Sequence, residues 1–473
     1  MRTPSRPIRL ALHLALAAPI ATPPGAQPPA RAATPHSLSD ALRRADSAAF
    51  GSRVAEAQRR TLDAQALAPL RGILPTLRVE AALVRTTDPV AVFGTTMRQR
   101  NLAAADFNPA TLNRPGVAAN VAGGVVADIP LLNADAWAGR TAARTAARAA
   151  RDAGDWARLA IRADVVRAWF GVLLADERAA TLAAGLAAAR AHVAQAATLQ
   201  RNGVVTSSDA MLAGVRAADV EAQLLEATAA ARTARQSLGV LLGASDGELV
   251  TPAGALPDPP TLRAAAAGDS LLAAAPRRDE SAAHLAAEAA GEDGRRARAE
   301  NLPRLNSFAR YDWNDRATPF AGEPSWTVGV VASWTIVSGG STLSATRAAA
   351  GREAAARAAA DGVTARARLE RDDAERALRV ALERLSLAER SAVQGADAHR
   401  IVERRYEGGL AAVTELLDAQ ATQTATALGV AKARFDVVAA LAARRLALGL
   451  DPGSLAALDD TTATPNRPTK EHD

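Results

Sequence analysis

The sequence predicts a mainly α-helical protein with a smaller β part, built as a duplicated unit of long helices plus two strand hairpins. Three observations lead to this fold class. Alanine dominates the 49% of hydrophobic residues while aromatic residues reach only 3%, and alanine favours helix but buries little area. A glycine-centred motif recurs 206 residues along the chain. Four segments alternate apolar and polar residues with the period of a strand.

The repeat is the first element of this prediction. Gly203 recurs 206 residues later as Gly409, and each copy ends in a Leu-Gly helix stop. Each motif follows a very long Ala/Arg/Glu stretch, expected to be helical over about 136–200 and 341–407. At 1.5 Å per residue such a helix spans about 100 Å, far more than a globular domain needs. The same spacing relates three more pairs: Asp209 and Glu415, Ala213 and Ala419, and Gly243 and Gly449.

The repeat also sets the expected organisation of the chain. The first structural repeat (helix, strand, strand, long helix, helix) covers 37–243. The remainder of the second (strand, strand, long helix, helix) covers 301–450. Between them, 244–300 is rich in proline in its first part and is expected to be a linker with short equatorial helices. The polar, Pro-containing segment 451–473 is expected to be a disordered tail.

The four alternating segments are each about ten residues long, the length that a tilted transmembrane strand requires. In the first, Leu77 and Val79 face one way, and Arg78 and Glu80 face the other. The alternative is an ordinary soluble hairpin packed on the helices. Four aromatic residues of the last hairpin are expected at a membrane interface, where rings with polar tips are favoured: Tyr311, Trp313, Trp326 and Trp334.

The N-terminal residues 1–32 are predicted to be a secretory signal peptide. Three arginines precede an apolar run from Leu10 to Ile20, which is too short to span a bilayer as a helix. Small residues follow, and the exact cleavage site is left open. No later segment offers the roughly 20 uncharged apolar residues that a membrane helix needs. We therefore expect an exported chain that could enter a membrane only as strands.

Composition argues against several other functions. The 473 residues carry a net charge of +6 and no cysteine. Arginine is interleaved with Asp and Glu, a pattern typical of solvated helix faces rather than of nucleic-acid binding. The lack of cysteine excludes disulfides and thiolate chemistry. The histidines are scattered without metal-ligand spacing, and glycine-rich phosphate loops are absent. We expect no catalytic residue, no cofactor, no metal site and no nucleic-acid partner.

Four strands cannot close a membrane barrel, because the smallest such barrels need eight. Open sheet edges are not tolerated in lipid, where their backbone groups would stay unsatisfied. The sequence therefore predicts an oligomer in contact with outer-membrane lipid, and a trimer would supply twelve strands.

In the order of its elements, the chain resembles the TolC-like outer membrane efflux proteins, also called outer membrane factors. The resemblance covers about 37–450. It rests on the duplicated order, the Gly-Leu turn at Gly409, the segment from Glu415 to Gln420, and the loop from Asp88 to Pro115. Any one of these motifs is weak, but the ordered set in duplicate is specific.

The resemblance implies a homotrimer, with a twelve-stranded outer-membrane barrel on a periplasmic α-helical barrel, in a Gram-negative bacterium. It implies a passive exit duct of a tripartite efflux pump or a type I secretion system. Docking of a periplasmic adaptor (membrane fusion) protein and an inner-membrane pump of RND, ABC or MFS type would open the duct. The channel itself would use no cofactor. Neither the transported substrate nor the pump class follows from the sequence.

The resemblance also assigns the two helix-to-helix turns to adaptor docking. Glycine lets the chain reverse tightly, and Val204 and Leu410 offer apolar side chains that a partner could cover. The alternative is that both glycines merely end helices. The docking residues are Gly203, Val204, Val205 and Thr206 in the first turn and Gly409, Leu410 and Ala411 in the second.

Four residues near these turns are expected to line the periplasmic entrance: Asp209, Tyr406, Glu415 and Asp418. Glu415 and Asp418 share a helix face, and three copies would place six carboxylates around a ring that attracts cations. The alternative for both is a solvated face or helix-dipole acids. Tyr406 matches a position that helps to hold the entrance shut. Ala411 stands where the family has an arginine, so the partner of Asp209 and the entrance lock are left open.

The main alternative function is a periplasmic adaptor or a coiled-coil scaffold protein without a membrane barrel. An adaptor would share the signal peptide and the coiled coil. It would not contain two matched strand hairpins or two helical tips. The Trp-rich second hairpin argues against a soluble scaffold.

Overall fold

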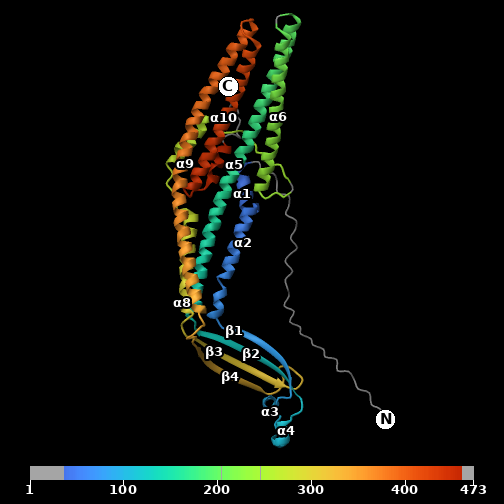
Figure 1. The fold of residues 1–473 in the computed structure, drawn as a ribbon, viewed down its shortest axis with the longest axis vertical. Helices are drawn as coiled ribbons and strands as arrows, with labels where there is room; N and C mark the ends of the chain where they lie inside the picture. The colour runs from blue at the N-terminus through green and yellow to red at the C-terminus, as the bar shows by residue number, and fades with distance from the viewer. Residues whose placement is uncertain (1–36, 204, 246, 461–473) are drawn as a thin grey trace, which may run out of the picture.

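A computed structural model describes residues 37–203, 205–245 and 247–460. Two helical tips lie at one end of the long axis, a body of long helices fills the middle, and a sheet lies toward the other end (Figure 1). The predicted signal peptide at 1–32, the docking residue Val204 and the last part of the predicted tail, 461–473, lie outside the described residues.

Two helices run the length of the body, as the sequence predicted. Helix α5 spans Ala134–Arg201 and α9 spans Ser341–Glu407, with 68 and 67 residues. Neither contains a proline, and their Ala/Arg/Glu composition favours helix throughout. Each ends at a tip where a glycine takes a positive φ, +71° at Gly203 and +72° at Gly409. A side chain would be strained at this φ, so glycine allows the chain to turn back.

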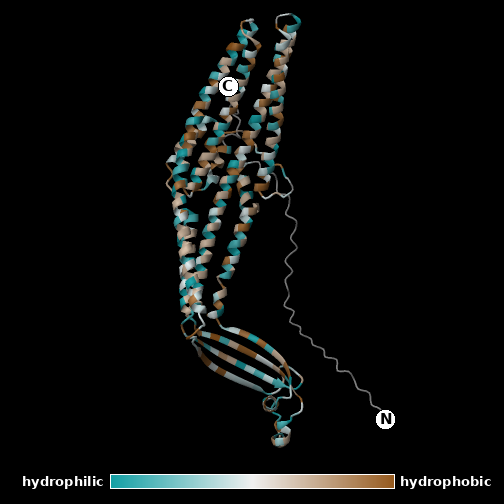
Figure 2. Ribbon diagram, in the orientation of Figure 1, coloured by the Kyte–Doolittle hydropathy of each residue, from teal (hydrophilic) through white to brown (hydrophobic). Residues whose placement is uncertain are grey.

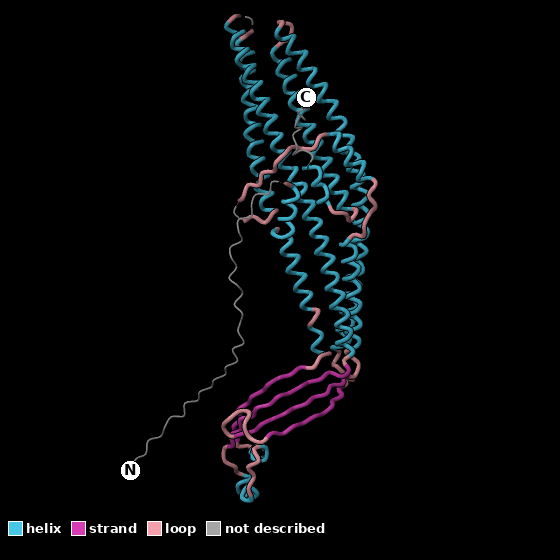
Figure 3. Tube along the Cα trace, turned by 180° about the vertical axis from the view of Figure 1, so that it is seen from behind, coloured by secondary structure: helices cyan, strands magenta, loops and turns pink. Residues whose placement is uncertain are grey.

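The remaining helices flank these two rods at different heights (Figures 1 and 3). Helices α6 and α10 return from the tips to the middle of the body, and α2 and α8 lie between the middle and the sheet. The helices are α1 (Leu38–Ala48), α2 (Phe50–Gln65), α3 (Pro89–Arg98), α4 (Pro109–Asn113), α6 (Ser207–Leu241), α7 (Pro259–Ser270), α8 (Arg278–Ala299), α10 (Val413–Ala447) and α11 (Ala457–Asp460), with 3-10 turns η1 (Ala68–Gly72), η2 (Ala104–Phe107) and η3 (Pro452–Ala456).

The strands form one antiparallel sheet in the order β1-β2-β3-β4. Its inner pair, β2 with β3, joins the hairpin of the first repeat to that of the second, with a register shift between Pro130 and Leu132. Within this sheet β1 and β4 each have a single neighbour, so one side of each carries unpaired backbone groups. The strands are β1 (Thr76–Thr86), β2 (Ala118–Leu132), β3 (Arg304–Asp315) and β4 (Pro324–Ser333).

The main apolar core lies midway along the helices. Trp169 and Phe170 of α5 are fully buried there against leucines of the neighbouring helices. A second, smaller cluster lies at the tips and is centred on Leu416. Elsewhere the buried residues between the helices are mostly alanine. Alanine lets the helix backbones approach closely but buries little apolar area. Figure 2 shows hydrophobic and hydrophilic residues mixed along the body.

Helix α8 is longer than the short helices that the sequence predicted for 244–300. It has 22 residues and packs along both α5 and α9. The close approach is possible because small residues face its neighbours: Gly291 and Gly294 leave room for Glu353 of α9. In position along the repeat, α8 corresponds to α2 of the first half.

The C-terminal segment also differs from the prediction. Residues 452–460, which were assigned to a disordered tail from 451 onward, form η3 and α11. Leu455 and Leu458 are buried in the main core. The carboxylate of Asp459 accepts hydrogen bonds from the Trp169 indole at 3.0 Å and from the Leu38 amide at 2.8 Å. Polar composition suggested disorder, but two leucines at helical spacing are enough to anchor the segment.

Candidate functional sites at the helix tips and the sheet

The first tip is closed by a local hydrogen-bonded cap. The Asp209 amide donates to the Thr206 hydroxyl at 3.2 Å, and the Thr206 amide donates to the Asp209 carboxylate at 3.0 Å. This reciprocal capping box satisfies two of the free amides at the start of α6. The Thr206 hydroxyl also donates to the Asp209 carboxylate at 2.8 Å, and this bond, followed by the one from the Thr206 amide, lowers the pKa of Asp209. Asp209 therefore has a partner within its own turn, which the sequence had left open.

The second tip lacks such a cap. Helix α10 starts after Ala412, whose side chain cannot accept a hydrogen bond. Instead, Arg405 reaches across the turn: its guanidinium donates to the Leu410 carbonyl at 3.1 Å and lies 3.6 Å from the Glu415 carboxylate. Leu410 itself is 74% exposed at the apex, as the docking prediction requires.

Tyr406 lies directly beneath the second turn. Its side chain is only 6% exposed and packs in the tip cluster with Val413 and Leu416. The hydroxyl is buried without a hydrogen-bond partner among the described residues. Burial, followed by the negative charge of Asp209, raises the pKa of Tyr406. Within one chain the ring therefore holds the tip helices together.

The two acids of α10 lie near the tip, and neither is isolated. Glu415 pairs with Arg405, and Asp418 lies 3.3 Å from the guanidinium of Arg216 on α6. Arg216 and Arg405 are functional candidates that sequence reasoning missed. For Arg405, the signal was its position ten residues before Glu415 across a tight turn, which places the two on facing helix ends.

The sheet has one apolar and one polar face, visible as alternating colours in Figure 2. Val79, Val125 and Tyr311 stand opposite one another on the apolar face. On the other face, Arg78 pairs with Asp128 at 2.8 Å and Arg310 pairs with Asp312 at 2.7 Å. The charged side chains thus neutralise one another on the polar face of the sheet. The apolar face can contact an apolar medium without burying a charge.

The four predicted interface aromatics divide between the two ends of the strands. Tyr311 and Trp326 are directly paired across β3 and β4, and Trp313 lies edge-on to Tyr311 with ring centroids 4.8 Å apart. These three lie near the β3–β4 loop. Trp334 follows the last residue of β4 at the helical end, where its indole donates to the Asn301 carbonyl at 2.9 Å.

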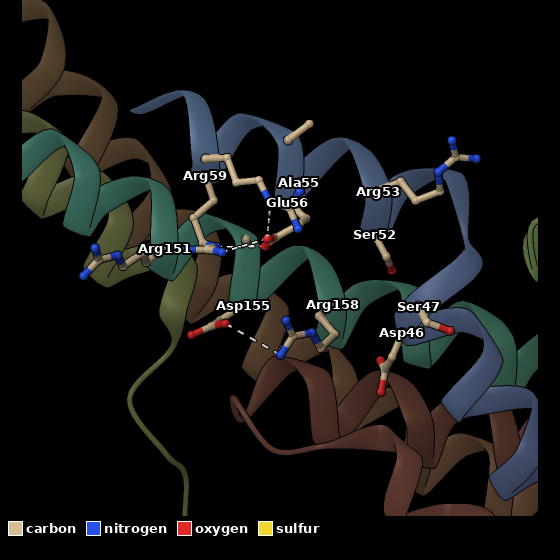
Figure 4. A pocket seen from close by; sticks show the side chains of 13 residues that line it. Asp46, Ser47, Ser52, Arg53, Ala55, Glu56, Arg59, Arg151, Asp155 and Arg158 are labelled. Atoms are coloured by element: carbon tan, nitrogen blue, oxygen red, sulfur yellow. Dashed lines mark hydrogen bonds and ion pairs between the residues drawn. The ribbon is translucent and has the colours of Figure 1, made fainter. Parts of the chain in front are cut away.

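A charged groove of about 670 Å³ lies between α2 and α5 (Figure 4). Its ionic groups largely satisfy one another: Arg59 and Arg60 both lie 2.7 Å from the Glu56 carboxylate and lower its pKa to about 2. Arg158 lies 4.0 Å from Asp155 on the opposite wall. Within the described ranges, no three His, Asp or Glu side chains come together in a way that could hold a metal ion.

None of the helices in the described part of the chain is both long enough and apolar enough to cross a membrane.

Comparison with known proteins defines the class. The profile of the outer membrane efflux protein family matches residues 44–244 and 271–450. The chain therefore belongs to the outer membrane efflux protein family, which confirms the resemblance found in the sequence. It is an efflux channel of the outer membrane whose helical body extends into the periplasm, and the family is one of passive channels.

Solved structures share the fold at low sequence identity. A membrane protein from Pseudomonas aeruginosa has a TM-score of 0.72 at 21% identity, over 87% of this chain and 92% of that one. The outer membrane protein VceC from Vibrio cholerae has a TM-score of 0.70 at 20% identity, over 88% and 96%. The CmeC outer membrane channel of Campylobacter jejuni has a TM-score of 0.73 at 14% identity, over 91% and 90%. No curated protein sequence matches significantly.

Proposed function

We propose that the protein is the exit duct of a tripartite efflux pump or type I secretion system, assembled as a homotrimer. In this assembly, three sheets close into a twelve-stranded barrel in the outer membrane, and the helices form a tunnel through the periplasm. A periplasmic adaptor protein docks at the helix tips and links the duct to an inner-membrane pump. The channel uses no cofactor, and the pump supplies the energy.

The observation that carries the proposal is the two-faced sheet with free edges. A sheet whose apolar face carries Val79, Val125 and Val328 is stable in lipid only if its edges β1 and β4 are paired. The edges of one copy can be paired only by another chain, and three four-stranded sheets give a number of strands that barrels of this kind contain. Oligomerisation is therefore a physical requirement of the membrane location.

The spacing of the aromatic side chains supports the membrane assignment. Trp326 and Trp334 are eight positions apart in the sequence. At roughly 3.3 Å per residue, this corresponds to roughly 26 Å along the strand, or to roughly 20 Å across the membrane at a strand tilt of about 40°, which covers most of the roughly 25 Å apolar band of outer-membrane barrels. Tryptophan at both ends of such a band is typical of the two membrane interfaces.

The tips supply the docking surface in this proposal. The exposed Leu410 at the second apex offers an apolar contact, and Val205 of the first turn is partly exposed. Around the entrance, Glu415 and Asp418 would form a ring of acids, each next to an arginine. The mixed charge leads us to expect a weaker preference for cations than bare carboxylates would give.

The oligomer can be tested because the chain has no cysteine of its own. Cysteines introduced in pairs along β1 and β4, beginning with Leu83→Cys and Val328→Cys, should crosslink neighbouring copies in outer-membrane fractions and give a ladder that ends at the trimer. Matched pairs within the sheet, on β2 and β3, should crosslink only inside one chain. Recovery of a soluble monomer without intermolecular crosslinks would overturn the proposal.

A further inference from the structure

Two histidines face each other inside the helical bundle just below the tips. His192 of α5 and His399 of α9 are 8% and 9% exposed, and their ring centroids lie 6.4 Å apart. The Nε2 atom of each ring is buried without a hydrogen-bond partner in the described part of the chain. An unsatisfied buried polar atom lowers the stability of the folded protein. Two such atoms at one level of the bundle therefore indicate a role other than packing.

This histidine layer borders the tip cluster. On α5, the tip cluster begins at Val193 and Ala196, just after His192; on α9 it begins at Val402, three residues after His399. Behind the layer, toward the main core, Gly395 of α9 lies against Thr426 of α10, so this contact is also made by small and polar groups. The apolar tip is thus joined to the rest of the bundle through a polar segment.

The surroundings of His192 disfavour a charged imidazole. Burial is the main cause of its lowered pKa, and the adjacent His399 acts in the same direction. Glu403, one turn beyond His399, opposes this effect, as do hydrogen-bonding contacts with Gln195 on the same helix as His192 and with Gln420 of α10. Two charged residues of α6 have partners elsewhere, because Arg216 pairs with Asp418 and Glu221 pairs with Arg190.

We propose that the His192–His399 layer makes the entrance proton-sensitive, so that acidification of the periplasm loosens the tips and favours the open channel. In the packed arrangement, a proton on His192 introduces a buried charge beside a second imidazole, and the polar neighbours of the ring do not offset the cost of burial. Separation of α5 from α9 lets water hydrate that charge. This inference rests on the proposed function in one respect, namely that the tips form the entrance.

The sign of the effect follows from linkage. A histidine with a lowered pKa in the packed arrangement stabilises that arrangement fully above its ordinary value of 6.5. This stabilisation is lost as the pH falls below that value, because the loosened arrangement takes up more protons. For one histidine that stays neutral in the packed arrangement and has its ordinary pKa when loosened, the ratio of loosened to packed arrangement should rise about tenfold between pH 7.5 and pH 5.5.

Single-channel recording in planar bilayers tests the gating effect. For the full-length protein, the open probability should rise about tenfold when the tip side is acidified from pH 7.5 to pH 5.5. The double variant His192→Gln and His399→Gln keeps polar groups at both positions but removes the titration, and its open probability should be flat. His284→Gln is the matched control, because His284 on α8 bonds only to Thr364 within the bundle and is exposed.

Thiol labelling tests the structural step independently of conductance. Ala213→Cys places a unique thiol in the buried tip cluster, and Met211→Cys places one on the exposed face of the same helix. The ratio of their labelling rates cancels the intrinsic effect of pH on a thiol. That ratio should rise about tenfold between pH 7.5 and 5.5 with both histidines present and should stay constant in the double variant.

The outcomes separate this inference from the proposed function. If no variant conducts at any pH, the proposed channel is wrong. If the channel conducts but neither open probability nor the labelling ratio depends on the two histidines, the proton-sensitive layer is wrong. A response of labelling without a response of open probability also overturns it, since the layer then does not control the entrance.

Discussion

The two helix tips occupy equivalent places in the repeat, yet they are stabilised in different ways. The first is held by Thr206 and Asp209, which cap the start of α6 through reciprocal hydrogen bonds within four residues. The second has alanine at the capping position. It depends on a long arginine side chain that crosses the turn and on a buried tyrosine beneath it. Gln200 stands where the second repeat has Tyr406.

This difference in stabilisation indicates which of the two tips can rearrange. A capping box is short, local and independent of neighbouring helices. By contrast, the contact of Arg405 with Leu410 and Glu415 is exposed and costs side-chain entropy to maintain. We therefore expect the first tip to stay formed and the second to rearrange when the entrance opens.

Removal of the ring beneath the second tip should have the largest effect. Tyr406→Ala leaves a cavity in the tip cluster and should reduce its stability by roughly 3–5 kcal/mol, with a higher open probability in bilayer recordings. Tyr406→Phe is the matched control. The hydroxyl has no partner among the described residues, so its loss should leave thermal stability equal or improved. A strongly destabilised Tyr406→Phe would show that the hydroxyl has a partner in the assembled channel.

A cap introduced at the second tip should make it resemble the first. Ala412→Ser places a hydroxyl at an N-cap with extended backbone, three residues before Glu415, and so completes a capping box. We expect a gain of about 1 kcal/mol and a lower open probability. The reverse change at the first tip, Thr206→Ala, should cost about 1 kcal/mol while leaving open probability unchanged. Equal effects on gating from both changes would contradict the comparison.

The charges beside the second tip should tune selectivity in opposite directions. Replacement of Glu415 and Asp418 by alanine should reduce the preference for cations, because it removes the acids from the proposed entrance. Replacement of Arg216 and Arg405 by alanine should increase this preference, since both acids then lose a neighbouring cation. Reversal potentials under a salt gradient measure both changes in the permeability ratio. An unchanged ratio in both variants would remove the acids from the pore lining.

The smallest effect concerns the pH dependence of the first tip. Hydrogen bonds from Thr206 lower the pKa of Asp209 below its ordinary value of 3.8. The cap is therefore fully stabilising above that value and weakens as the pH falls through the lowered pKa. Amide exchange at Ser208 and Asp209 should accelerate more below pH 4 in the native protein than in Asp209→Asn. Identical acid profiles for the two would mean that the carboxylate contributes nothing to the cap.

Much of this architecture could be predicted from the sequence because it rests on local signals. Alanine-rich, proline-free stretches ended by glycine gave α5 and α9 to within about two residues at each end. The strict alternation around Val79 gave the two-faced sheet, because a shift of one residue would place Arg78 on the apolar face. These features need no knowledge of distant parts of the chain.

What escaped prediction depends on contacts between distant segments. The burial of Leu455 and Leu458 requires the main core to be in place, and composition alone suggested disorder. His192 and His399 looked scattered, yet they precede their tip glycines by 11 and 10 residues, which brings them to one level of the folded repeat. The pairing of Asp418 with Arg216 likewise arises only when α6 and α10 lie side by side.

Hydrogen exchange of the reconstituted channel tests the difference between the tips most directly. Peptides that cover residues 205–210 and 411–416 report the first turn of α6 and of α10 in the same sample. We expect faster exchange at the first turn of α10, because Ala412 provides no cap and the exposed Arg405 side chain closes the turn. Equal exchange, or faster exchange at the Thr206–Asp209 cap, would contradict it.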